Sequence, residues 1–418
     1  MQVRELFLTV HPDDIVKQVF DLKIHPKALT RSGAIFQHNT AYLKRLCRLI
    51  NSHLAKVVFD SPGFEIVRGK LPKLTIDQVC SLYKRLYVEV EISEKLFVHF
   101  DVPTPFYAPK DVRISLLKQN YSNYVTMIEK LGKSFPLLYV VHGWTEDEIR
   151  LSIELFESER IVATPSYLAE THARAVRTGQ YGFSSINKVA FGSYMMLKNP
   201  RVGVVSETEL LQYYVKTVPK KAVWERLAKA MNLLRDKYEV FVLGGSSPNT
   251  CHLIFLAGAK AIDGSSWTFA AKLGRIFIPE YGEVRPEHVE KNERVFKLMQ
   301  EYWNRPDNPL KDTISLHQFL EFTSEPWRKQ GIRHVHEGYI AWMLRATWNL
   351  YVMHIEEEIA NEYATDFDRY VKYLEQRFRH SSYLKNVLKT VVKNIKKPYV
   401  QTRLDIYFKM DDNIKNIL

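Results

Sequence analysis

Short apolar runs recur along the first two thirds of the chain, and stretches with helical spacing separate several of them. Eight runs lie at residues 34–36, 57–59, 97–100, 137–141, 161–163, 189–191, 240–243 and 259–262. The helical stretches lie at residues 114–131, 146–156, 222–234 and 249–256. Strands that alternate with helices predict parallel crossovers, and eight such strands favour a (β/α)8 TIM barrel over an open sheet.

After residue 279 the pattern changes to helical spacing alone. The apolar positions predict helices over residues 286–299, 338–358 and most of 367–395. We therefore expect a barrel core over residues 1–285 and an α-rich C-terminal extension over residues 286–418, which would complete the barrel and bind nucleic acid. A chain of 418 residues is long for one domain, but barrels with insertions reach this length.

The hydrophobic content, the cysteines and the net charge limit which kinds of protein this chain can be. Hydrophobic residues make up 46% of the chain, enough for a large core, and the absence of an apolar leader or a run of about 18 apolar residues predicts a cytoplasmic protein without a membrane segment. The three cysteines form no CxxC pair, which argues against a disulfide framework and against a cysteine-rich zinc site. Lysine and arginine total 59 against 47 acidic residues, and the net charge of +12 favours a polyanion such as nucleic acid as partner.

Three acidic residues, Asp60, Asp101 and Asp263, each follow an apolar run directly. In a (β/α)8 barrel the carboxyl ends of all strands meet at one mouth, so these carboxylates would face one another. For any one of them a turn-forming role is the commoner explanation, since Asp often begins turns. Three together favour a site, and opposed carboxylates are typical of a nucleophile paired with a general acid/base.

A basic stretch with two tyrosines lies near the C-terminus. Its residues are Arg377, Arg379, Tyr383, Lys385, Lys389, Lys393, Lys396, Lys397, Tyr399 and Arg403. Because cations bind phosphates and aromatic rings stack on bases, this stretch is a candidate nucleic-acid surface. A solvated helix face explains it equally well.

Six segments resemble, in chain order, the motifs of the queuine- and archaeosine-type tRNA-guanine transglycosylases, which are (β/α)8 barrels that exchange guanine for a 7-deazaguanine. The segments are DSPGFE at 60–65, FDVPTP at 100–105, VHG at 141–143, AFG at 190–192, LGGSSP at 243–248 and GAKAID at 258–263. The family's motifs in the same order are DSGGFQ, FDxxTP, VQG, a GG pair, MGVGxP and GxDxFD. The resemblance covers about residues 55–280.

This resemblance implies roles for the matching residues. Asp263 would be the nucleophile that captures the sugar, and Asp60 the general acid/base that moves a proton to the departing base and from the incoming one. Asp101 would accept hydrogen bonds from the guanine edge, and Phe64 would stack on the ring. Further base contacts would come from His142, the Gly192 N–H, Leu243 and Gly244, although a plain turn or a phosphate nest explains the Gly-Gly-Ser run nearly as well.

The chain departs from the tRNA enzymes in its metal ligands. Those enzymes bind structural zinc through a CxCxxC segment and a downstream His, whereas residues 327–358 contain no cysteine. We therefore expect no zinc and no required cofactor. Interactions other than zinc coordination must then hold residues 327–358 in place. Three histidines there, His334, His336 and His354, would have the chemistry to bind a metal with Glu357 or Glu358, but packing or surface roles are the commoner explanation for scattered histidines.

These departures favour the deazapurine DNA-modification (DpdA) family, similar transglycosylases that exchange guanine in DNA for 7-cyano-7-deazaguanine or a derivative. Such an enzyme would bind the phosphates of the DNA backbone and flip the target guanosine into the barrel. The expected nucleic-acid contacts are Lys272, Arg275, Lys393, Lys396 and Lys397. Aromatic residues that would support the extruded strand, unless they belong to the core, are Trp144, Tyr181, Tyr194 and Trp267.

Two alternatives stay open. The first is a tRNA-guanine transglycosylase of the queuosine or archaeosine pathway, against which the missing zinc ligands count. The second is a non-catalytic paralogue that binds nucleic acid beside an active subunit, against which the presence of both Asp60 and Asp263 counts. The expected partners are DNA or tRNA, the 7-deazaguanine base, and a second copy of the chain or other proteins of a modification cluster, with no membrane.

Overall fold

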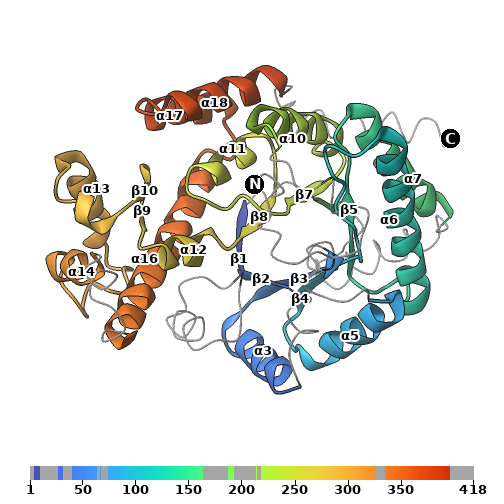
Figure 1. The fold of residues 1–418 in the computed structure, drawn as a ribbon, viewed down its shortest axis with the longest axis horizontal. Coiled ribbons are helices and arrows are strands. Elements are labelled where there is room, and N and C mark those ends of the chain that lie inside the picture. Colours follow the sequence, from blue (N-terminus) through green and yellow to red (C-terminus); the bar gives the residue numbers. More distant parts are fainter. Residues whose placement is uncertain are drawn as a thin grey trace, which may run out of the picture.

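The protein closes a parallel barrel. Its computed structural model describes residues 4–9, 27–31, 40–63, 66, 74–162, 187–192, 213, 218–324 and 335–395. Within them eight parallel strands pair in chain order, and the last pairs with the first (Figure 1). They are β1 (Glu5–Thr9), β2 (Lys27–Arg31), β3 (Lys56–Asp60), β4 (Glu94–Val98), β5 (Leu137–Val141), β6 (Lys188–Phe191), β7 (Glu239–Val242) and β8 (Ala261–Gly264). The prediction of a parallel α/β barrel is confirmed.

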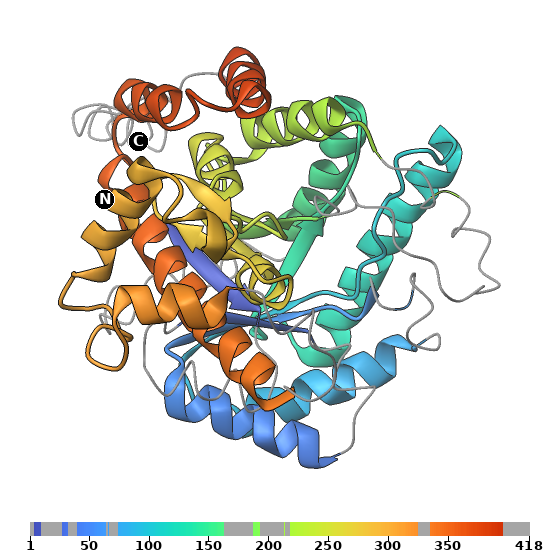
Figure 2. The same cartoon turned by 60° about the vertical axis from the view of Figure 1, so that its left-hand side comes forward.

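Helices surround the barrel (Figures 1 and 2). They are α3 (Thr40–His53), α5 (Ile76–Glu89), α6 (Lys110–Leu131), α7 (Glu146–Val162), α10 (Lys220–Leu234), α11 (Thr250–Leu256) and α12 (Ser266–Lys272). The sequence of α5 shows why a helix begins there, because Thr75 and Gln78 form a capping box at its start. Its buried residues, Val79, Cys80, Tyr83 and Leu86, recur with helical spacing and so lie on the side that faces the barrel.

The strands are apolar on both faces because one face packs under the helices and the other fills the barrel. The inward side chains form a closed inner cluster of Phe7, Val58, Leu96, Val98, Leu138, Val140, Ala190, Phe241 and Ala261. Alternate residues such as Val57 and Phe59 belong to the outer core beneath the helices. Since side chains alternate along a strand, this register fixes which residues at the strand ends point into the mouth.

One strand prediction was wrong, one lies outside the described residues, and the first strand was missed. Residues 161–163 were predicted as a strand, but α7 continues through Val162, so that prediction was wrong. A short β-branched run has the same apolar pattern as a last helical turn. Residues 34–36 lie outside the described residues, and β2 occupies the second place in the barrel. β1 was not predicted.

The described residues after α12 form one hairpin and then helices. The hairpin pairs β9 (Ile276–Ile278) with β10 (Gly282–Val284), and the helices are η2 (Pro286–His288), α13 (Glu293–Trp303), α14 (Leu316–Thr323), α16 (Val335–Glu362), α17 (Phe367–Arg377) and α18 (Ser382–Asn394). α16 packs on α12 and reaches β1, where the Leu6 N–H donates to Glu357 Oε2 at 2.8 Å. α16 therefore covers the first strand of the barrel.

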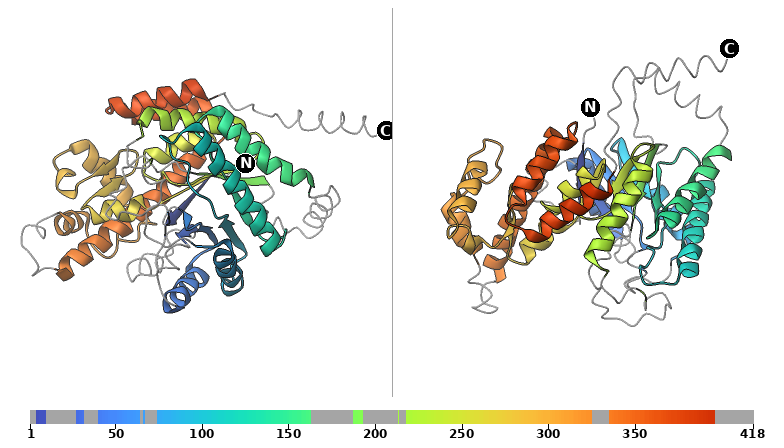
Figure 3. Two further views of the ribbon diagram at one scale, coloured as in Figure 1. Left: turned by 45° about the vertical axis from the view of Figure 1, so that its right-hand side comes forward. Right: turned by 90° about the horizontal axis from the view of Figure 1, so that it is seen from above.

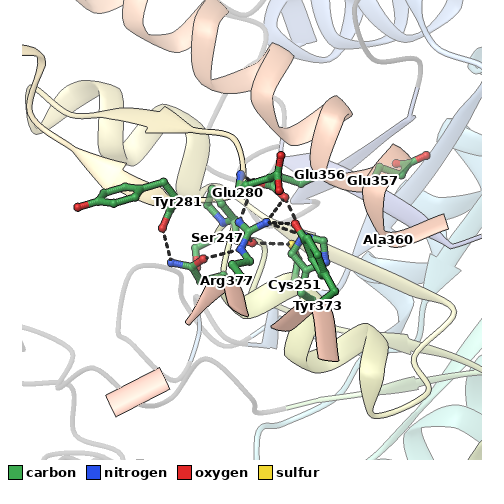
Figure 4. A network of polar contacts seen from close by, with 12 residues as sticks. Ser247, Cys251, Glu280, Tyr281, Glu356, Glu357, Ala360, Tyr373 and Arg377 are labelled. Carbon is green, nitrogen blue, oxygen red and sulfur yellow. Dashed lines mark hydrogen bonds and ion pairs between the residues drawn. The ribbon is translucent and has the colours of Figure 1, made fainter. Parts of the chain in front are cut away.

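A buried polar network ties α16 and α17 to α11 (Figure 4). Arg377 on α17 donates through both terminal nitrogens to Glu356 on α16, each at 2.8 Å, and His252 Nε2 on α11 lies 2.7 Å from Glu356 Oε2. Burial raises the pKa of Glu356, but Arg377 and His252 outweigh it and lower that pKa to about 2. Burial lowers the pKa of His252 to about 4. At neutral pH the network therefore holds an ionised Glu356 and a neutral His252.

This network holds residues 335–362 against the barrel. Among the residues that the structure describes, no three His, Cys, Asp or Glu side chains gather where they could hold a metal ion. His354 lies 3.5 Å from Glu358 on the helix surface, and His334 and the His336 side chain lie outside the described part. In the same described part, no helix has the length and apolar character needed to cross a bilayer.

Candidate active site at the barrel mouth

Five of the predicted site residues occupy inward-facing positions at the carboxyl ends of the strands. Each comes two residues after a member of the inner cluster: Asp60 after Val58, His142 after Val140, Gly192 after Ala190, Leu243 after Phe241, and Asp263 after Ala261. Because side chains alternate, all five point toward the barrel axis. β3 and β8 are separated in the ring by β1 and β2, so Asp60 and Asp263 enter the mouth from different sides.

Asp263 is buried, and the loop after β7 orients its carboxylate. The Gly244 N–H donates to Asp263 Oδ1 at 2.6 Å. Gly244 and Gly245 adopt φ of 98° and 97°, a region that favours glycine, and this turn aims the amide at the carboxylate. Gly244, which we expected to contact a base, contacts the candidate nucleophile instead. Leu243 stays half-buried against the inner cluster, beneath the mouth.

Asp60 ends β3 and is half-buried. Its Oδ1 accepts a hydrogen bond from the Ser61 N–H at 2.9 Å, and the Ser61 hydroxyl donates to Asp101 Oδ1 at 2.5 Å. A Cβ on Gly63 would lie 1.7 Å from the Asp101 carbonyl oxygen, so this position requires glycine. Ser61 thus links two of the three acids. Phe64, the predicted stacking residue, lies outside the described residues.

Asp101 is buried in the loop after β4, three residues beyond the strand. Its Oδ2 lies 2.8 Å from His142 Nε2. Burial raises the pKa of Asp101, but hydrogen bonds from His142 and Ser61 outweigh it and hold that pKa below its ordinary value. Asp101 is therefore a carboxylate at neutral pH. Each carboxylate oxygen can accept a second hydrogen bond.

Gly192 supports His142. Its N–H donates to the Val141 carbonyl at 3.2 Å, so the amide that we expected to bind a base carbonyl continues the pairing of β5 with β6. A Cβ on Gly192 would lie 2.6 Å from His142 Cε1. The glycine is therefore needed to make room for the imidazole.

Arg226 on α10 is a buried cation that the sequence analysis missed. It donates to the carbonyls of Gly143 and Gly192, the latter at 2.8 Å, and its guanidinium lies 4.3 Å and 4.4 Å from the ring centroids of Trp144 and Phe191. Burial lowers its pKa to about 9, so Arg226 remains charged at neutral pH. It ties together the two loops that flank His142. No local sequence signal marks it, because its partners lie far away along the chain.

His99 is fully buried just before Asp101. Its Nδ1 accepts the Val140 N–H at 3.1 Å, and its ring stacks on Tyr139. Burial lowers the pKa of His99 to about 4. The imidazole is therefore neutral, and its proton is on Nε2 because Nδ1 is the acceptor.

Three of the predicted nucleic-acid contacts lie within the described residues. Lys272 is exposed at the end of α12, Arg275 pairs with Glu283 at 2.6 Å, and Lys393 is exposed on α18. Lys396 and Lys397 lie outside the described residues, as do the aromatic candidates Tyr181 and Tyr194. The other two aromatic candidates, Trp144 and Trp267, are core residues.

Comparison with models of known protein families gives no match for this chain. No curated protein is significantly similar to it either.

Proposed function

We propose that the protein is a base-exchange transglycosylase that replaces guanine in DNA with a 7-deazaguanine. One observation carries the proposal. Asp60 and Asp263 stand at inward-facing positions on different sides of one barrel mouth, and Ser61 links Asp60 to Asp101, which is a buried carboxylate. This arrangement offers a nucleophile, a proton carrier and an acceptor for the base edge in one place.

In the first step a carboxylate oxygen of Asp263 attacks C1′ of the target nucleotide. The C1′–N9 bond breaks, and its electron pair leaves with guanine, which takes a proton from the Asp60 carboxyl group. An Asp263–sugar ester and a neutral guanine result. The Gly244 N–H, 2.6 Å from Asp263 Oδ1, fixes the plane of the attacking carboxylate.

The second step reverses the first with a new base. The 7-deazaguanine loses its N9 proton to the Asp60 carboxylate, N9 attacks C1′, and the ester bond breaks to restore the Asp263 carboxylate. Two inversions at C1′ retain the original configuration, as in glycosidases that form a covalent intermediate. Asp60 ends protonated, ready for the next cycle, and no oxidant or reductant is needed.

Asp101 supplies the selectivity for guanine. The carboxylate accepts hydrogen bonds, and guanine presents the N1–H and the 2-amino group on its pairing edge, whereas adenine has no N–H at N1. A 7-cyano-7-deazaguanine keeps the same donors, so one site serves both the leaving and the incoming base. A stacked duplex hides this edge and C1′, so the nucleotide must be extruded into the mouth.

The experiment is base exchange on three substrates: duplex DNA, single-stranded DNA and tRNA, each labelled in guanine. Label release is followed after addition of 7-cyano-7-deazaguanine. We expect release from DNA by the wild-type protein, at least about 10³-fold slower release by the Asp263→Asn variant because the nucleophile is lost, and unchanged release by Asp236→Asn, an exposed control.

Three other outcomes would reject part or all of this proposal. Release from tRNA alone would reject DNA as the substrate and retain the chemistry. Exchange by Asp263→Asn at the wild-type rate would reject the covalent mechanism. No release from any substrate by a folded protein would reject the proposed activity.

A further inference from the structure

Lysines gather on two helices that are distant in the sequence. α10 exposes Lys220, Lys221 and Lys229, and α18 exposes Lys385, Lys389 and Lys393. α18 contains no acidic residue, and its lysines recur every four positions. Its buried residues are Val387, Leu388 and Val391, so the lysines lie on the opposite side, toward solvent.

α10 and α18 lie side by side and run in the same direction (Figures 1 and 3). At their starts, Lys220 Nζ lies 4.4 Å from the centroid of the Tyr383 ring. Near their ends, Asn232 Nδ2 donates to the Asn394 carbonyl at 2.7 Å. The three lysines of α18 therefore form a row along its exposed side, and the three lysines of α10 lie around the exposed surface of the neighbouring helix. We call these six residues the lysine face, and the half-exposed Tyr383 lies beside Lys220 at one end of it.

The charge of the lysine face is almost unopposed. Lys221 lies 3.7 Å from Glu225, and within the described part of the chain the other five lysines have no acidic partner. From Lys385 to Lys393 the helix rises by about 12 Å. Duplex DNA carries one phosphate per roughly 1.7 Å of axis, so this length faces about seven phosphates. These phosphates, counted over both strands, outnumber the three lysines of α18, so each lysine of the row can pair with one.

The direction of α10 places the lysine face relative to the mouth. α10 ends at Leu234, whose carbonyl accepts the Tyr238 N–H immediately before β7 begins. Its last turn therefore lies at the amino end of the barrel, and its first turn, with Lys220, lies toward the mouth. The lysine face runs down the flank of the barrel from the mouth side.

We propose that the lysine face binds the phosphate backbone of duplex DNA beside the nucleotide that is exchanged. The choice of DNA rests on the function proposed above; the face itself rests on the six lysines and the packing of α10 on α18. It holds the flanking duplex by charge and reads no sequence, because phosphate contacts position a duplex without specifying it.

The test compares two triple variants that each remove three exposed cations. One is Lys385→Gln, Lys389→Gln and Lys393→Gln on α18; the matched control is Lys44→Gln, Arg45→Gln and Arg48→Gln on α3, which also lacks acidic residues. Binding of a fluorescent duplex is measured by anisotropy between about 50 and 200 mM salt. We expect the slope of log K against log salt to become shallower by up to about 3 in the α18 variant and to stay near wild type in the α3 variant.

An unchanged slope in the α18 variant, or equal changes in both variants, would overturn the proposal. So would binding of phosphatidylserine vesicles through these lysines without binding of duplex DNA. Because binding is measured without catalysis, the two proposals fail separately. DNA binding through α18 without base exchange would refute only the activity, and base exchange with unchanged DNA binding in the α18 variant would refute only the lysine face.

Discussion

Asp101 owes its ionised state to two donors of different origin. The Ser61 hydroxyl comes from the turn after β3, and His142 comes from the end of β5. Both hydrogen bonds go to the charged form and counter the effect of burial. A buried acid without these donors would take up a proton and could no longer accept both donors of a guanine edge.

Removing either donor is therefore expected to raise the pKa of Asp101. We predict that the acid limb of kcat/KM for base exchange moves to higher pH in His142→Ala and, by a smaller amount, in Ser61→Ala, because His142 is the stronger of the two influences. The control is His317→Ala, an exposed histidine. An acid limb that stays in place in both variants would show that Asp101 does not limit the reaction at low pH.

Two Arg–Glu contacts join α16 to α17, one of them buried and the other exposed. Arg377 and Glu356 are fully buried, whereas Arg369 and Glu362 lie 2.5 Å apart at the surface with more than half of each side chain exposed. Breaking a buried pair leaves an uncompensated charge in the core, while an exposed pair contributes little. These two contacts join the same helices, so they form a matched comparison.

We predict that Glu356→Ala lowers the free energy of unfolding by about 3–5 kcal/mol and that Glu362→Ala lowers it by less than about 1 kcal/mol. Urea denaturation followed by circular dichroism measures both. Similar losses in the two variants would mean that the buried network does not hold α16 and α17 to the barrel.

The positions of the acids at the barrel mouth could be predicted from the sequence, because an acid after an apolar run is a local pattern. Asp60 and Asp263 are at strand ends as expected, and the alternation of side chains then fixes their direction. Arg226 and its partner Gly143 are 83 residues apart, and Glu356 and His252 are 104 apart. Only the folded chain brings such pairs together. The error at residues 161–163 arose because a three-residue run fits a strand and a helix end equally well.

At the scale of the whole molecule, buried neutral histidines make stability depend on pH. Burial lowers the pKa of His99 and of His252 from 6.5 to about 4. As pH falls from 6.5 toward 4, the unfolded chain takes up protons that the folded chain refuses, so stability falls. At pH 5 each histidine accounts for a loss of about 2 kcal/mol. Glu356 adds a further loss only below its ordinary pKa, as pH falls toward 2.

We therefore predict a lower urea midpoint at pH 5 than at pH 7. In His252→Gln one of the two histidines no longer titrates, so the difference between the two pH values is expected to shrink by about half. A difference of the same size in wild type and variant would exclude His252 as a source of the pH dependence.

The hydrogen bond from Leu6 to Glu357 joins the first strand to a helix that is made 351 residues later. At a synthesis rate of about 5–20 residues per second, β1 leaves the ribosome roughly 20–70 s before the side chain that caps it exists. β8, whose Ile262 pairs with Leu6, is made 256 residues after Leu6, so for most of that interval both edges of the growing sheet are open to other chains. Closure of the barrel therefore waits until residue 264 has been made, and until then the nascent chain exposes strand edges through which it can aggregate.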